Sequence, residues 1–141
     1  RMLYESDLAN GIGNFSARVL ALAAGKRVAE KLSPDVENKI KEVKESVSEK
    51  IDHFKLHEAL GVIMGLVKFG DEYVNTMAPW KMEEGKKKNE VLWNLVVLLD
   101  NLAAFLDPFL PQTSSRITSQ LLWEGDTLVV TKKDILFPRL T

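Results

Sequence analysis

The chain has 141 residues, 45% hydrophobic and 28% charged, which suits one folded domain with one core and excludes a disordered protein. Cysteine is absent, which excludes disulfides and cysteine-ligated zinc. The formal net charge is −1, which excludes a polycation that binds nucleic acid through bulk charge. No signal peptide can be recognised in the sequence. We expect a fragment of a longer, cytoplasmic protein.

The first predicted helix runs from about Ser6, as N-cap, to Ala24, and Gly25 ends it. Gly11 and Gly13 lower its helix propensity, so we interpret them as places where a neighbouring helix or a ligand approaches closely. The apolar residues follow the spacing of a buried helix face and are Leu8, Ile12, Phe15, Val19 and Leu22.

One stripe of this helix is polar. Asn10, Asn14 and Arg18 stand four residues apart, so each step turns by only about 40° around the helix axis. The stripe carries two amides and one guanidinium, whose donors and acceptors suit base edges or phosphate. The alternative is that these side chains are merely solvated or cap a neighbouring helix.

A second helix opens at Ser33-Pro34, because proline fits the first helical position. Its outer face of lysine and glutamate is typical of a solvated surface. Its narrow apolar stripe consists of Val36, Ile40, Val43 and Val47.

The third predicted helix begins between Asp52 and Lys55 and ends at Ala78, because Pro79 disfavours helical geometry in the residue before it. The fourth runs from about Lys88 to Leu106 and is apolar on nearly all sides, as in the central helix of a bundle. Polar residues and a proline interrupt the stretch from Val91 to Leu110, so we predict a buried helix rather than a membrane span.

A short fifth helix is predicted from Thr113, as its N-cap, to about Leu122. Residues 126–131 have the β-branched composition of a short strand, which must pair or dock to be stable. The predicted fold class is therefore all-α. It is an antiparallel bundle of about five helices over residues 1–123, with an extended or β C-terminal tail over residues 124–141.

Catalytic chemistry finds little support in the sequence. No phosphate-binding glycine loop, serine elbow or acid–base carboxylate pair is present, and we predict no catalytic residue. His53 and His57 have the spacing of two zinc ligands, but a third ligand is missing and no glutamate follows His53. We interpret them as surface histidines and predict no metal site.

Trp80 follows the third helix directly, braced by Pro79. It either fills the end of the core or presents its indole as a stacking platform for a base. Trp93 and Trp123 are predicted to be core residues.

Four strings in this order resemble the anticodon-binding domain of methionyl-tRNA synthetases. They are D-L-A-N-G-I-G-N-F-S-A-R (7–18), G-D-E-Y-V-N-T-M-A-P-W-K-M (70–82), the proline-bracketed segment 106–122 and I-L-F-P-R-L (135–140). The resemblance covers most of the chain. In the second predicted helix and its flanking loops, only the general type of residue matches the family, and no motif does.

The resemblance implies a helical bundle that reads the CAU anticodon of tRNA(Met). It assigns base and backbone contacts to Asn10, Asn14 and Arg18, and reception of the unstacked anticodon to Pro79 and Trp80, with the indole stacking on the first base. The implied partners are the anticodon loop of tRNA(Met) and the catalytic domain of the parent enzyme, with no membrane and no DNA. The catalytic H-I-G-H-like and K-M-S-K-S-like strings do not occur, so this fragment needs no cofactor, and ATP with Mg²⁺ would serve the parent ligase.

Two alternatives remain open at this point. One is the equivalent bundle of another class I synthetase, for cysteine, valine, isoleucine or leucine. The other is a non-catalytic helical bundle that binds proteins, which predicts a buried Trp80.

Overall fold

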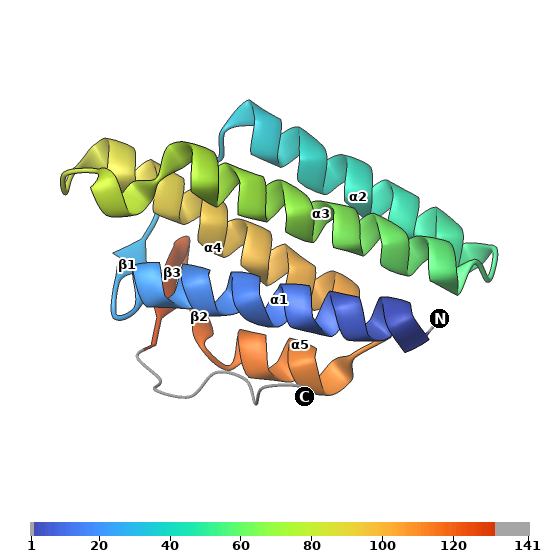
Figure 1. Cartoon of the computed structure of the whole chain (residues 1–141). Coiled ribbons are helices and arrows are strands. Elements are labelled where there is room, and N and C mark those ends of the chain that lie inside the picture. The colour runs from blue at the N-terminus through green and yellow to red at the C-terminus, as the bar shows by residue number, and fades with distance from the viewer. Residues whose placement is uncertain (1, 132–141) are drawn as a thin grey trace.

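The computed structural model describes residues 2–131, with the backbone alone for residues 2–7. Within that range, five α-helices form a bundle and three short strands form a sheet at one end of it (Figure 1). The helices are α1 (Met2–Ala23), α2 (Pro34–Asp52), α3 (Leu56–Met77), α4 (Lys86–Leu106) and α5 (Pro111–Thr118), with a 3-10 turn η1 (Pro79–Lys81). The strands are β1 (Arg27–Val28), β2 (Leu121–Glu124) and β3 (Thr127–Val130). The predicted all-α bundle is confirmed.

Helices α1 and α3 run in the same direction, and α2 and α4 run against them (Figure 1). Helix α4 touches α1, α2 and α3, and every residue from Val91 to Leu99 is buried. By length and composition α4 could cross a membrane, but most of its apolar stretch is buried inside the bundle, as predicted for a central core helix.

The predicted caps of α1 and α5 are wrong. Ser6 lies inside α1, which begins at Met2 because no glycine or proline interrupts the residues before Ser6. Thr113 lies inside α5, because Pro111 takes the first helical position and Leu110 the N-cap.

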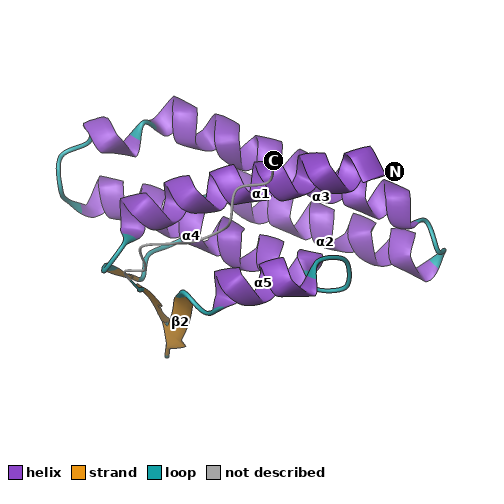
Figure 2. Cartoon of the chain, turned by 60° about the horizontal axis from the view of Figure 1, so that its bottom comes forward, coloured by secondary structure: helices purple, strands orange, loops and turns teal. Residues whose placement is uncertain are grey.

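The prediction that α5 reaches Leu122 is also wrong. Residues 121–124 instead form β2, which pairs with β3 in antiparallel register from Leu121↔Val130 to Glu124↔Thr127. Gly125, with φ of 63°, lies in the two-residue turn of this hairpin, a conformation that favours glycine. Figure 2 shows the strands beside the end of α5.

The predicted strand within residues 126–131 exists as β3, and it lies at the centre of the sheet order β1-β3-β2. Its other partner, β1, is only two residues long and was not predicted. Val28, Leu128 and Val130 are buried against the bundle. The predicted tail segment 134–140 lies outside the described residues.

The core follows the predicted periodicity with few exceptions. The stripe of α2 and the central Trp93 are buried as predicted. Leu22 is only partly buried, and Trp123 is 48% exposed with its ring edge against Trp93, at a centroid distance of 5.8 Å. The close approach of a neighbouring helix predicted at Gly11 is made by α3, because a Cβ on Gly11 would lie 3.5 Å from Val67. A Cβ on Gly13 would meet no described atom within 4 Å, so approach of a ligand there stays a prediction.

Candidate nucleic-acid interface

The amides of the polar stripe on α1 are accessible. Asn10 and Asn14 are exposed, although the helix around them is buried on its other face. Neither amide forms a side-chain hydrogen bond with any residue that the structure describes. Both therefore keep two N–H donors and one carbonyl acceptor for a ligand.

Arg18, the third member of the stripe, is engaged by α3. Its Nη2 donates a hydrogen bond to Asn75 Oδ1 at 2.8 Å, and its Nη1 lies 3.7 Å from Asp71 Oδ1. About a third of the Arg18 side chain remains exposed, and Asn75 is exposed as well. The stripe is thus joined to the second half of α3, the helix that leads to Trp80.

Three successive contacts set the register of α1 against α3. A Cβ on Gly11 would lie 3.5 Å from Val67, the ring of Phe15 lies over Gly70, and Arg18 reaches Asp71 and Asn75. Residue numbers rise together on both helices, as expected for a parallel pair. With a rise of about 1.5 Å per residue, the stripe extends about 12 Å along α1 toward the end of the bundle that carries η1.

Trp80 is presented by the turn that follows α3. The helix cannot continue through proline, which lacks an N–H group and clashes with the preceding turn. Ala78 leaves the helix with φ of 46°, and η1 makes one tight turn in which Lys81 N–H donates to Ala78 O at 2.9 Å. Pro79 is buried and Trp80 is 51% exposed. The alternative in which Trp80 fills the core is therefore wrong.

The structure joins Arg18 to α3, but it gives no hydrogen bond between Trp80 and the α1 stripe among the described residues. A shared concavity for both stays a prediction. Sequence reasoning missed Asp71 and Asn75. Their spacing of four residues places them on one face of α3, just before Pro79, and that spacing was the signal that could have found them.

The electrostatics of this seam are set by partial burial. Loss of hydration raises the pKa of Asp71, and the nearby Arg18 charge opposes that rise only in part. Beside η1, Glu84 bonds Lys88 at 2.8 Å and Lys26 at 3.4 Å, and these two lysines lower its pKa. Glu84 thereby connects the β1 segment to the loop after Trp80.

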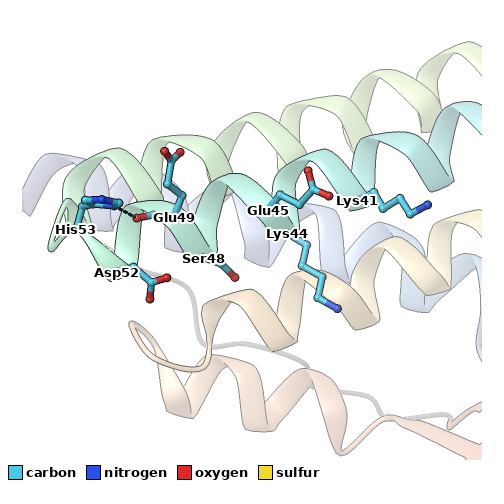
Figure 3. Close-up of a pocket in the computed structure, with 7 residues that line it drawn as sticks. All are labelled: Lys41, Lys44, Glu45, Ser48, Glu49, Asp52 and His53. Atoms are coloured by element: carbon cyan, nitrogen blue, oxygen red, sulfur yellow. Dashed lines mark hydrogen bonds between the residues drawn. The ribbon is translucent and has the colours of Figure 1, made fainter.

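Two grooves of the described surface involve α2, and the second of them is also lined by Val62 and Gly65 of α3. The first is lined by charged and polar side chains of α2 and of its C-cap His53, and Figure 3 shows them pointing in different directions rather than converging. There, His53 Nδ1–H donates to Glu49 O at 2.9 Å. In the part of the chain that the structure describes, no three histidine, aspartate or glutamate side chains are grouped to hold a metal ion.

The family model described as "Anticodon-binding domain of tRNA ligase" matches residues 35–136, well over half of the chain. The chain belongs to this family. The match includes Pro79 and Trp80 but begins after α1, so an anticodon-binding role for Asn10, Asn14 and Arg18 stays a prediction.

The curated relatives that this chain matches include several methionine–tRNA ligases. The "Methionine--tRNA ligase" of Clostridium acetobutylicum is 32% identical over 96% of the chain, and that of Methanopyrus kandleri is 28% identical over 97%. The chain spans about a quarter of the length of these relatives. The predicted resemblance to methionyl-tRNA synthetases is confirmed. These findings favour it over both alternatives, the bundle of another class I synthetase and a protein-binding bundle.

A solved structure gives the same fold. Mycobacterium tuberculosis methionyl-tRNA synthetase, in its free state, superposes with a TM-score of 0.81 at 20% identity, over 98% of this chain and 33% of that one. At this identity the likeness concerns the fold alone.

Proposed function

We propose that this domain reads the CAU anticodon of tRNA(Met) for a methionyl-tRNA synthetase. The observation that carries the proposal is the half-exposed Trp80, held at the end of α3 in a chain of the anticodon-binding family. Proteins read single-stranded RNA loops by stacking unpaired bases on aromatic rings and by bonding the base edges. Trp80 is exposed in the turn that directly follows α3, the helix that contacts Arg18.

In this mechanism Trp80 stacks on the first anticodon base, and Asn10 and Asn14 bond base edges with their free amides. Arg18 contacts a phosphate or a base with the guanidinium N–H groups that Asn75 leaves free. Pro79 acts through its burial, because a fixed Pro79 holds the backbone from which Trp80 projects.

The parent enzyme would ligate methionine to tRNA(Met) in the cytoplasm, with ATP and Mg²⁺ bound in its catalytic domain. Support comes from the named relatives, of which this chain spans about a quarter. The formal net charge of −1 gives little bulk attraction to RNA, so contacts of the catalytic domain with the rest of the tRNA must supply much of the affinity. The tail predicted over residues 124–141, of which 132–141 lie outside the described residues, would dock on the bundle or on that catalytic domain.

Binding to labelled anticodon stem-loops, measured by fluorescence anisotropy at low salt, tests the proposal. We expect the CAU loop to bind more tightly than loops with a changed first base, because edge contacts discriminate between bases. Equal affinity for all loops would indicate a surface that binds RNA without reading the anticodon. Preference for the triplet of another class I synthetase would contradict the assignment to methionine.

A further inference from the structure

The hydrogen bond between Arg18 and Asn75 fixes which way the Asn75 amide faces. An arginine side chain only donates hydrogen bonds, so the Asn75 atom that receives Nη2–H must be the oxygen. The acceptor of Asn75 is therefore used on the protein side. Its NH₂ group, with two donors, has no partner among the residues that the structure describes, and Asn75 is exposed.

The same bond restrains a side chain that is otherwise long and mobile. Of the five N–H groups of a guanidinium, Asn75 takes one. The Asp71 carboxylate, 3.7 Å from Nη1, attracts the charge but is too distant for a hydrogen bond. A guanidinium held in this way keeps its remaining donors for a ligand and loses less conformational entropy when it binds.

We propose that Asn75 is a positioning residue for Arg18, and that the two side chains together present hydrogen-bond donors, beside the Asp71 carboxylate, to acceptor atoms of the RNA. The inference rests on the proposed function and adds a residue to its site. Acceptor atoms of this kind are phosphate oxygens or the O2 and N3 atoms of a cytosine edge. An aspartate at this position would also hold Arg18, but it would cancel the positive charge and offer no donor.

A double-mutant cycle on the 141-residue chain tests the positioning role. The cycle combines Asn75→Ala with Arg18→Ala and measures binding of the CAU stem-loop at low salt. We expect Asn75→Ala to weaken binding roughly 3- to 10-fold when Arg18 is present, and by a clearly smaller factor in the Arg18→Ala background, where only the donors of Asn75 itself are lost. A purely structural role of Asn75 would give the same loss in both backgrounds.

Asn75→Asp separates positioning from donation, because it keeps the acceptor for Arg18 but removes both donors and adds a negative charge. We expect it to bind the stem-loop more weakly than Asn75→Ala. Asn38→Ala, which removes an exposed asparagine from α2, is the matched control and should leave binding unchanged. Thermal unfolding of each variant checks that the fold is intact.

The acceptor atoms can belong to a phosphate or to a base edge, and the effect of Asn75→Ala on binding differs between the two. If the surface holds a phosphate, Asn75→Ala weakens all loops equally and makes the salt dependence of binding less steep. If it holds a base edge, the loss is confined to the loop with cytosine in first position. Unchanged binding by Asn75→Ala, with a clear loss for Arg18→Ala, would overturn the inference alone. Unchanged binding by Arg18→Ala would overturn the proposed role of Arg18 and the inference with it.

Discussion

The ring of Phe15 on α1 lies so close over Gly70 on α3 that a Cβ on Gly70 would come within 2.6 Å of it. The contact lies about one turn before the Arg18–Asn75 hydrogen bond, so it sets the separation of the two helices beside that bond. Gly70→Ala should lower the free energy of unfolding by about 1–3 kcal/mol, because a packed core resists added volume. Urea unfolding measures this change.

Gly65, also on α3, provides the matched control. A Cβ there would meet no described atom within 4 Å. Gly65→Ala should therefore stabilise the protein by up to about 1 kcal/mol through helix propensity alone. If both substitutions changed stability in the same direction and by the same amount, the tight contact of Phe15 with Gly70 would not exist in solution.

Asn94 holds three helices together from inside the bundle. Its buried side chain accepts a hydrogen bond from Ser33 N–H at 3.0 Å and donates one to the Tyr73 hydroxyl at 2.8 Å. Asn94→Ala should cost about 2–3 kcal/mol, because both partners lose their bond in a poorly hydrated place. Tyr73→Phe removes one of the two bonds and should cost about 1 kcal/mol. A loss for Asn94→Ala no larger than that for Tyr73→Phe would contradict this account.

Phe54 occupies a backbone position that favours glycine. With φ of 58° it follows α2, and the hydrogen bonds from Phe54 N to Ile51 O and from Lys55 N to Lys50 O complete a Schellman motif. Its side chain is 89% exposed, so little packing would be lost on its removal. Phe54→Gly should raise the free energy of unfolding by about 1 kcal/mol, whereas Phe54→Ala, which keeps the Cβ, should not. Equal effects of the two substitutions in thermal unfolding would show that the backbone is not strained there.

Asp100 should make stability depend on pH in the direction opposite to that of an ion-paired carboxylate. Burial raises its pKa, and the hydrogen bond from Trp123 Nε1–H, at 3.3 Å, opposes the rise only in part. Because the folded state holds the proton more tightly, the stabilisation by protonated Asp100 is complete below the ordinary aspartate pKa and is lost as pH rises through the raised value. Asp100→Asn should therefore stabilise the protein at neutral pH, and the gain should disappear in acid. Urea unfolding across this pH range would contradict the account if the gain were the same at every pH.

The helices of this fold could be predicted from the sequence because their signals are local. Apolar spacing and the prolines at 34 and 79 placed α2 and α3 closely. The sheet could not be predicted, because β1 has only two residues and exists through pairing with β3, about a hundred residues later in the chain. Leu121 and Leu122 fit the spacing of either a helix or a strand, and the glycine turn after them decided the outcome.

The candidate site divides in the same way. The α1 stripe and the Pro-Trp pair follow from helix periodicity and from proline chemistry, so both could be identified from the sequence. The spacing of Asp71 and Asn75 places them on one face of α3, but their contact with Arg18 could not be predicted, because it depends on the register of α1 against α3. The exposure of Trp123 depends on the unforeseen strand β2, on whose outer surface it lies.

The most direct test compares two tryptophans of nearly equal exposure. Trp80 is 51% exposed at the proposed site, and Trp123 is 48% exposed on β2. Binding of the CAU stem-loop should weaken by roughly 5- to 100-fold for Trp80→Ala, since stacking contributes about 1–3 kcal/mol per base, and by less than about 2-fold for Trp123→Ala. Unchanged binding by a folded Trp80→Ala variant, or an equal loss for both variants, would contradict the proposal that Trp80 receives the anticodon.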